Sequence, residues 1–401
     1  MRSYYATGLM PKKKILILAN TFYPILGGVE THLADLVKSI SQEGDLEAHL
    51  IAYTYWGDKN NPYVGRHGNL TVQLLKLCSA NPKSLSNWLQ IHSYPFYFSF
   101  TILPMFFYVF FYCLKHKNFD IAHANSHTTG ITAVLISRIF GIKKKFISMH
   151  GFMFSQQTDF QRYNKARWII KSQFKRFDKI FCVGQRSYNE NRELMDGDPA
   201  NKIEMFRYWV GDIFFKAEQD KKLAKAKLGL ADRKIVFYAG RLVATKGILV
   251  LLEVAKQMPQ YDFAIAGDGI STEVVKEQSQ QHKNIKFLGA LENKIMPEWL
   301  AATDVSILLT QNDGEGIPRA LVESITCGTP VLALAKGGTK ELVDFGTGLV
   351  LENNIEDIKS KIELMLTDSE IYNQKRKNCR PIAEKYFSKD NAQIFIRNYR
   401  F

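Results

Sequence analysis

The sequence predicts an α/β protein made of two successive βα domains. Short apolar runs, several of them rich in β-branched residues, alternate with segments of helical length in both halves of the chain. A chain of 401 residues exceeds one ordinary core, and 46% hydrophobic with 23% charged residues is typical of a globular protein. The alternation indicates two mainly parallel sheets, each covered by helices.

The apolar runs are expected to be buried parallel strands. In the first half they span 14–20, 48–54, 120–124, 145–150 and 179–183, and in the second half 234–239, 262–266, 285–287, 305–309 and 330–334. Helices are expected between them, for example over 30–41 and 130–140. The strand pattern breaks at 207–222, which we take as the junction between the domains. The last segment, 380–401, is expected to be an amphipathic helix with Phe387, Ile394, Phe395 and Tyr399 available to dock.

The net charge of +14 belongs mainly to the first half. Residues 1–205 hold 25 Lys and Arg against 14 Asp and Glu. Anionic phospholipid, a phosphorylated substrate or nucleic acid could each account for a basic face, although no nucleic-acid motif accompanies the charge. The five cysteines are scattered without metal-ligand spacing, which favours reduced core thiols in a cytoplasmic protein. We do not expect a cleavable signal peptide.

Residues 94–113 form an uncharged run of 20 residues, rich in aromatic side chains. The length suits a membrane span, but Pro95 and Pro104 interrupt it and lysines follow it. A helix lying in a membrane interface fits this composition best. A buried core helix and a true span are the alternatives.

Glycine-rich turns follow several expected strands, and such turns let backbone N–H groups approach an anion. Gly27 and Gly28 open the helix after the first strand. They do not form the GxGxxG signature, so a nicotinamide cofactor is disfavoured. Gly267 and Gly269 flank Asp268 after a strand of the second domain, where α/β sheets bind ligands. Each motif alone is also compatible with a simple turn.

Two cations follow the first strand of the second domain. Arg241, after Gly240, offers a planar fork suited to phosphate oxygens, and Lys246 offers a point charge nearby. Together they could neutralise a diphosphate leaving group without Mg²⁺. Surface residues bonded to a helix end are the alternative interpretation.

Candidate polar residues also follow strands of the first domain. His150 ends one strand, where its imidazole could bond a sugar hydroxyl. His123, Asn125 and His127 cluster after another strand and are expected to line the same crevice. A structural role is the alternative for each.

Glu315 and Glu323 stand eight positions apart, the first in a Gly-rich turn and the second in a helix-like run that ends at Cys327 and Gly328. An apolar strand and a Gly337-Gly338 turn follow. Carboxylates beside strand ends and helix N-termini indicate a polar ligand site on an α/β sheet.

In this order the motifs resemble those of the large retaining glycosyltransferase family 4. They are the GGVE turn, His150, Gly240-Arg241 with Lys246-Gly247, the GDG turn, and the two glutamates. The resemblance covers essentially the whole chain and is most specific from 241 to 341. It implies the GT-B fold, two Rossmann-like domains facing across a cleft. The domains would be an acceptor-side domain over 1–209, a nucleotide-sugar-binding domain over 210–380, and a helix over 381–401 that packs back on the first.

The resemblance also implies a role for each matching residue. Arg241 and Lys246 resemble the cations on the donor diphosphate, and Glu323 the carboxylate that holds the ribose hydroxyls. Glu315, with the amides of Gly316 and Ile317, resembles the group that positions the donor sugar. The remaining correspondences are His150 at the sugar near the reacting centre, Gly28 against the phosphates, and Gly240 and Gly267 in the strand-end turns. One departure from the family pattern is the segment 207–212, at the expected hinge between the domains.

These correspondences imply a metal-independent enzyme without a cofactor, in which His150, Glu315, Arg241 and Lys246 carry the catalysis. It would move a sugar from a UDP- or GDP-sugar to a glycan or lipid-linked acceptor with retention of configuration. The basic first domain and residues 94–113 suit the cytoplasmic face of the inner membrane, in cell-surface polysaccharide synthesis. The alternatives are a non-catalytic nucleotide-sugar-binding module, a nucleic-acid-binding protein, and a GT-B epimerase or phosphorylase.

Overall fold

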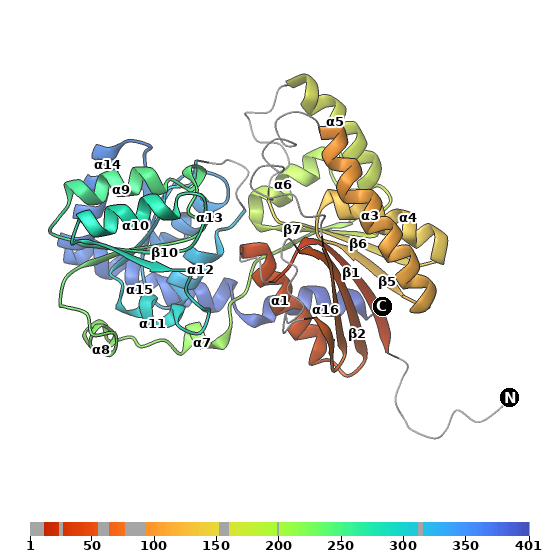
Figure 1. Cartoon of the computed structure of the whole chain (residues 1–401), viewed down its shortest axis with the longest axis horizontal. Coiled ribbons are helices and arrows are strands. Elements are labelled where there is room, and N and C mark those ends of the chain that lie inside the picture. The colour runs from red at the N-terminus through yellow and green to blue at the C-terminus, as the bar shows by residue number, and fades with distance from the viewer. Residues whose placement is uncertain are drawn as a thin grey trace.

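The computed structural model describes residues 12–23, 27–54, 64–76, 94–151, 160–198, 200–311 and 316–400. It contains two sheets, each flanked by helices, that form two adjacent lobes (Figure 1). The first sheet has eight strands in the order β3-β4-β2-β1-β5-β6-β7-β8, and the second has six in the order β11-β10-β9-β12-β13-β14. The strands pair in parallel except for β3 and β4. The predicted α/β class with two parallel-sheet domains is confirmed.

The first sheet contains β1 (Lys13–Thr21), β2 (Leu46–Thr54), β3 (Gly65–His67), β4 (Leu70–Lys76), β5 (Ile121–Ala124), β6 (Lys144–Met149), β7 (Lys179–Val183) and β8 (Ile203–Phe206). Its helices are α1 (Gly28–Ser41), α3 (Tyr94–Lys115), α4 (His127–Phe140), α5 (Phe160–Phe174) and α6 (Gly184–Leu194). The five strands expected in this half are present, and β3, β4 and β8 are additional.

The second sheet contains β9 (Ile235–Ala239), β10 (Asp262–Ala266), β11 (Ile285–Gly289), β12 (Val305–Leu308), β13 (Val331–Leu334) and β14 (Gly348–Leu351). The accompanying helices are α7 (Asp212–Phe215), α8 (Lys221–Lys227), α9 (Ile248–Gln257), α10 (Thr272–Gln281), α11 (Met296–Ala302), α12 (Arg319–Thr326), α13 (Thr339–Leu342), α14 (Ile355–Thr367) and α15 (Ser369–Tyr386), with short segments η1 (Ala244–Lys246) and η2 (Val343–Thr347). All five strands expected in this half are present, and β14 is additional.

Side-chain alternation along β1 divides the first domain into two helical layers. Ile15 and Ile17 pack with α1, whereas Leu16 and Leu18 face the helices on the opposite side of the sheet. Successive side chains of a strand point to opposite faces, so the side chains of one fully buried strand contribute to the cores on both sides of the sheet.

Helix α4 shows how local signals set an element's ends. The Ser126 side chain caps its first turn, and Gly141, at a φ of 69°, ends it.

The C-terminal segment crosses from the second domain to the first. α15 belongs to the second-domain core, and after η3 (Lys389–Ala392) the chain forms α16 (Gln393–Tyr399) beside α1 (Figure 1). Phe395 and Tyr399 of α16 are fully buried in the first-domain core, whereas Phe387 is buried in the second. The prediction of a single helix over 380–401 is therefore wrong. The helical path breaks after Tyr386, and the two pieces dock on different domains.

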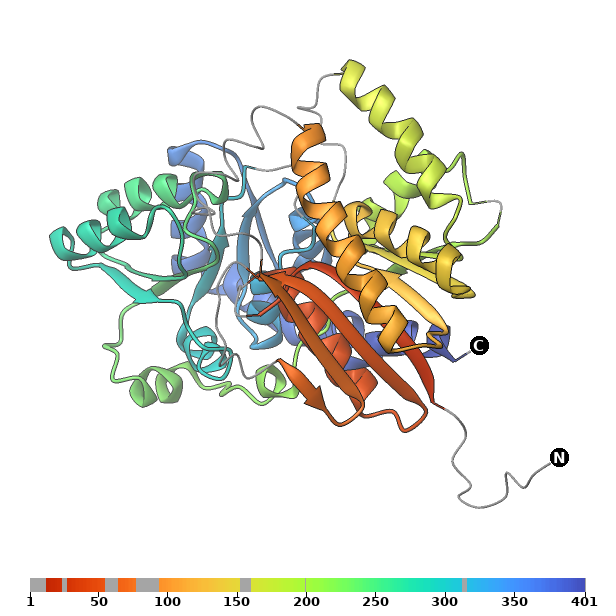
Figure 2. The same ribbon diagram turned by 45° about the vertical axis from the view of Figure 1, so that its right-hand side comes forward.

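Residues 94–115 form one helix, α3, with a buried side and an exposed side. Met105 and Val109 are buried against the sheet, whereas Phe107 and Phe111 are exposed to 55% and 64%. α4 lies next to α3 on the same face of the sheet (Figure 2). Within the described ranges, no helix is long and apolar enough to cross a membrane.

Candidate active site

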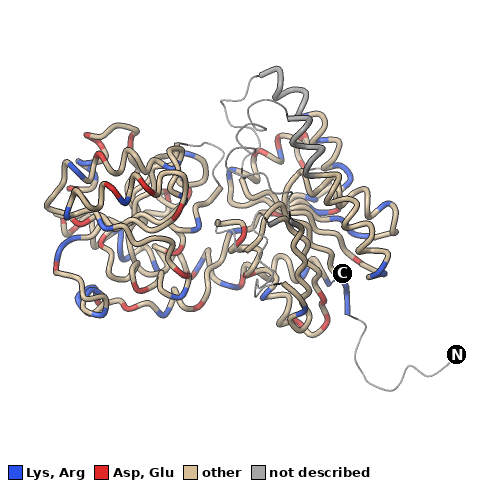
Figure 3. The backbone as a smooth tube through the Cα atoms, in the orientation of Figure 1, with Lys and Arg blue, Asp and Glu red and all other residues tan. Residues whose placement is uncertain are grey.

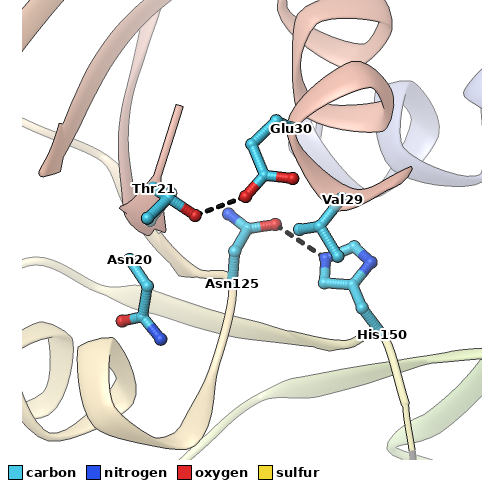
Figure 4. A pocket seen from close by; sticks show the side chains of 7 residues that line it. Asn20, Thr21, Val29, Glu30, Asn125 and His150 are labelled. Carbon is cyan, nitrogen blue, oxygen red and sulfur yellow. Dashed lines mark hydrogen bonds between the residues drawn. The ribbon is translucent and has the colours of Figure 1, made fainter. Parts of the chain in front are cut away.

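Polar residues from three neighbouring strands surround a cavity of about 180 Å³ at the carboxyl edge of the first sheet. Asn20 and Thr21 lie at the end of β1, and Asn125 and His150 follow β5 and β6. Glu30, in the first turn of α1, completes the polar lining (Figure 4). Carboxyl ends of parallel strands meet at one edge of a sheet, which explains why residues so far apart in sequence converge here.

Hydrogen bonds fix the His150 ring in the cavity wall. Its Nε2 lies 3.2 Å from Asn125 Oδ1, and its Nδ1 lies 3.2 Å from the Tyr208 hydroxyl. With the amide oxygen facing Nε2, the ring donates from Nε2 and accepts the Tyr208 proton at Nδ1. Burial lowers the His150 pKa to about 3. The neutral imidazole is therefore suited to orienting a hydroxyl group.

The Glu30 carboxylate turns back over the start of its own helix. It accepts a hydrogen bond from the Thr21 hydroxyl, and its Oε2 would lie only 2.3 Å from a Cβ added at Gly27. The first glycine of the GGVE turn therefore leaves room for this carboxylate. An acidic group in this cavity favours ligands that donate hydrogen bonds, such as sugar hydroxyls.

Turns of the second domain pack closely at the carboxyl ends of β9 and β10. A Cβ at Gly267 would lie 1.9 Å from the Gly240 carbonyl oxygen, and Gly267 has a φ of +144°. Leu242 N donates to the Asp268 carbonyl at 2.9 Å, which ties the two turns together. Glycine is thus required by close backbone approach. The paired turns carry Arg241, which is exposed, and lead into η1 with Lys246.

The two domains touch directly between these edges. A Cβ at Gly316 would lie 2.3 Å from the His150 carbonyl oxygen. Ile317 is buried and reaches the start of α6 at Gly184. The segment that leads into α12 in the second domain therefore packs against the end of β6 in the first.

A second contact between the domains centres on Glu341 in α13. Its carboxylate accepts from the Arg207 guanidinium, with Nε 2.9 Å from Oε1, and from the backbone N–H of Gln185 at 2.9 Å. The guanidinium also lies over the rings of Phe345 and Tyr386. Arg207 belongs to the segment where the sequence departs from the family motif.

The structure brings most of the expected site residues into three groups. His150 lies against Gly316 at the domain contact, and Gly240 and Gly267 form the paired turns beside Arg241. Gly28 lies near Arg319, which pairs with Glu323. Glu315 lies outside the described residues.

Two of the three residues expected to line the crevice, His123 and His127, do not line the cavity, and other residues were missed. His123 is fully buried inside the sheet, where it bonds Tyr399 and Ser148, while Asn125 does line the cavity. Sequence reasoning missed Glu30, although the GGVE turn contains it. It also missed the pairing of Asp35 with Arg319, for which no local signal exists. Within the described ranges, no group of three or more His, Cys, Asp or Glu side chains could hold a metal ion.

Two family models match the chain in succession. Residues 26–206 match Glycosyltransferase Family 4, and residues 220–386 match Glycosyl transferases group 1. The O-antigen biosynthesis glycosyltransferase WbnH of Escherichia coli is 25% identical over 281 residues, covering 69% of this chain and 76% of the relative. A UDP-Gal:alpha-D-GlcNAc-diphosphoundecaprenol alpha-1,3-galactosyltransferase of the same species is 29% identical over 284 residues, covering 67% and 71%.

Solved structures share the architecture of the whole chain. The HepE protein of Anabaena, solved in complex with UDP-glucose, superimposes with a TM-score of 0.73 at 20% identity, covering 96% of this chain and 98% of that one. The fold and site define a two-domain GT-B protein. The chain belongs to glycosyltransferase family 4 and is a glycosyltransferase of the hexosyltransferase type.

Replacing Gly316 by alanine is expected to reduce transfer by about a hundredfold while leaving the fold intact. The added methyl group would collide with the His150 carbonyl oxygen and push the domains apart, and a misplacement of about 1 Å can cost that much rate. Steady-state kinetics measures the effect. Gly44→Ala, where a Cβ meets nothing within 4 Å, is the control. Equal rates for both variants would contradict the importance of this contact.

Acid is expected to destabilise the protein through three histidines held neutral near the site. Burial lowers the pKa of His123 and His150 to about 3 and that of His32 well below 6.5. Below pH 6.5 the unfolded chain binds protons that the folded chain does not, so stability falls with pH by up to about 1.4 kcal/mol per unit per histidine. This loss of stability extends over the range from pH 6.5 towards pH 3.

Urea unfolding at pH 7.5, 6 and 5 measures this dependence. His32→Phe provides the comparison, because neither His32 ring nitrogen has a hydrogen-bond partner among the described residues. The variant should lose stability less steeply than the wild type as the pH falls. If the free energy of unfolding falls equally steeply with pH in both proteins, His32 does not contribute to the acid destabilisation.

Proposed function

We propose that this enzyme transfers a sugar from a UDP- or GDP-sugar to a glycan or lipid-linked acceptor in cell-surface polysaccharide synthesis. The observation that carries this proposal is the contact between Gly316 and His150. It joins the expected donor side of the second domain to a hydroxyl-binding cavity in the first. The printed activities of the two Escherichia coli relatives, an O-antigen glycosyltransferase and a galactosyltransferase acting on a lipid diphosphate, support this substrate class.

In this proposal the second domain binds the donor without a metal ion. Arg241 and Lys246 neutralise the diphosphate, and Glu323 accepts hydrogen bonds from the ribose. Two fixed cations can stabilise the charge that develops on a leaving diphosphate, which is the usual task of Mg²⁺. Glu315 and the amides of Gly316 and Ile317 position the donor sugar. Gly28 of the first domain lies against the phosphates, and Gly240 and Gly267 form the strand-end turns of the second domain.

The first domain orients the acceptor beside the donor sugar. Glu30 and Asn125 accept hydrogen bonds from hydroxyl groups. Neutral His150 exchanges one of its hydrogen bonds, to Asn125 or to Tyr208, for one to a sugar hydroxyl. The bond between the anomeric carbon and the diphosphate oxygen breaks, and the acceptor oxygen bonds the same carbon from the same face. The acceptor proton passes to the leaving phosphate oxygen. Configuration is retained because the acceptor attacks from the face that the diphosphate leaves.

A transfer assay in EDTA tests this function. The purified enzyme is incubated with UDP- and GDP-sugars and a lipid-diphosphate-linked sugar acceptor, and NMR determines the anomeric configuration of the product. Transfer in EDTA with the configuration of the donor is the expected result. Inversion would refute the same-face mechanism. Dependence on added Mg²⁺ would refute the metal-free site. Tight nucleotide-sugar binding without transfer to any acceptor would favour the non-catalytic alternative.

We further propose that α3, α4 and α5 place the enzyme on an anionic membrane at the cytoplasmic face of the inner membrane. Residues 94–117, 127–145 and 160–177, which contain these helices, hold twelve Lys and Arg and no Asp or Glu. Large apolar side chains are exposed on all three helices: Leu103, Phe107, Phe111 and Leu114 on α3, Leu135 and Ile139 on α4, and Trp168 and Ile169 on α5. In contrast, both charge signs are interspersed over the second domain (Figure 3).

Exposed apolar groups together with purely basic charge match an interface that offers anionic headgroups above acyl chains. Flotation with vesicles containing anionic phospholipid tests this orientation. Phe111→Glu should reduce the bound fraction strongly. Ile270→Glu, at a similarly exposed site just before α10 in the second domain, should not change the bound fraction. Equal binding of both variants would contradict docking through α3.

A further inference from the structure

Arg319 joins two carboxylates that belong to different domains. Its Nε donates to Glu323 Oε1 at 2.9 Å, one turn along α12, and its Nη2 donates to Asp35 Oδ2 at 2.6 Å, on α1 of the first domain. The side chain of Arg319 is only 4% exposed, and that of Glu323 is 10% exposed. This three-residue group is called the Arg319 bridge below.

The Arg319 bridge buries three charged groups, and this burial costs electrostatic free energy. Burial raises the pKa of both Asp35 and Glu323, and the Arg319 guanidinium opposes that rise. Removing charges from water costs several kcal/mol per ion, and an apolar replacement of similar volume is often no less stable. A gain in stability is therefore a weak explanation for three buried charges. The precise orientation of the Glu323 carboxylate explains them better.

The bridge also lies beside the glycine turn of the first domain. The Cβ of Arg319 lies 3.6 Å from the position of a Cβ at Gly28. Its remaining nitrogen, Nη1, is buried and has no hydrogen-bond partner among the described residues. A buried guanidinium nitrogen is a strong donor, and the described residues supply no acceptor for this one.

We infer that Arg319 is a positioning residue for the nucleotide, which orients Glu323 for the ribose hydroxyls and links donor affinity to Asp35 of the acceptor-side domain. The inference rests on the proposed ribose role of Glu323. Because Glu323 Oε1 is held by Arg319, the other carboxylate oxygen has a fixed direction. A substitution at Asp35, in the domain that does not carry Glu323, should then weaken nucleotide binding.

The ratio between the affinity for a nucleotide and that for its 2′-deoxy form distinguishes this role from a purely structural one. We would titrate UDP and GDP, each with its 2′-deoxy form, into the wild type, Arg319→Gln, Arg319→Lys and Asp35→Asn, with folding checked by thermal melting. In the wild type, loss of the hydroxyl should weaken binding of the preferred nucleotide roughly tenfold or more, as expected for a hydrogen bond to a charged group. Arg319→Gln should reduce this ratio to near one, Arg319→Lys should restore part of it, and Asp35→Asn should lower it to an intermediate value.

Glu341→Gln is the matched control, because it removes a different ion pair between the same domains without touching Glu323. It should keep the wild-type ratio. If neither nucleotide binds the wild type, the proposed function fails and the inference fails with it. If a nucleotide binds and the ratio is the same in wild type, Arg319→Gln and Asp35→Asn, only the inference is overturned. Should Arg319→Gln not fold, Asp35→Asn alone decides, since an unchanged ratio in that variant excludes the link.

Discussion

Alanine in place of Lys246 is expected to lower kcat/KM about a hundred- to a thousandfold. Lys246 ends the segment η1, in the turn that follows β9, and the adjacent Gly247 has a left-handed φ of 74° that fixes the turn. Loss of one preorganised charge contact to a transition state typically costs this much rate. Arg241→Ala should have a comparable effect, because both cations would contact the same diphosphate.

Initial rates with saturating acceptor measure the effect of the Lys246 substitution. Lys276→Ala is the matched control, because that lysine forms an exposed ion pair with Glu273 on α10. Such pairs contribute little, so the control should keep nearly the full rate. Similar rates for Lys246→Ala and Lys276→Ala would remove Lys246 from the diphosphate site.

Alanine in place of Phe395 is expected to destabilise the protein by about 3–5 kcal/mol, the usual cost of truncating a buried phenylalanine. The Phe395 ring is fully buried in the first-domain core, with its centroid 4.6 Å from that of Phe181 and 5.0 Å from that of Phe206. The last helix of the chain is thus part of a core that begins with β1.

Urea unfolding followed by circular dichroism tests this role of α16. Ile394→Ala, at a partly buried position of the same helix, should cost clearly less than Phe395→Ala. If truncating Phe395 costs no more than truncating Ile394, α16 is only loosely attached to the first domain.

The sequence was most informative about central strands and the turns that follow them. Buried parallel strands such as β1 and β10 are nearly continuous apolar runs, and glycine-rich turns lie at their ends, so both can be recognised locally. The strands β8 and β14 were missed because each has only four residues and lies at an edge of its sheet. Short edge strands carry too little periodicity to be distinguished from loops.

Contacts between distant residues could not be predicted in this way. Arg319 and Asp35 are 284 residues apart, and Arg207 and Glu341 are 134 apart, so no periodicity connects them. His123 was misassigned because it lies within β5 and its side chain enters the sheet core, whereas Asn125, just after the strand, reaches the cavity. A one- or two-residue difference in strand position thus decided which side chain faces the cavity.

The measurement that tests the central claim most directly is thermal stabilisation of the purified protein by UDP-, GDP- and ADP-sugars in EDTA, with Lys246→Ala alongside. A ligand at about 100 times its dissociation constant adds roughly 2.7 kcal/mol to the free energy of unfolding. We expect a clear rise in melting temperature with a UDP- or GDP-sugar and no rise in the Lys246→Ala variant. An equal rise in both proteins, or none with any nucleotide sugar, would contradict a metal-free diphosphate site at Arg241 and Lys246.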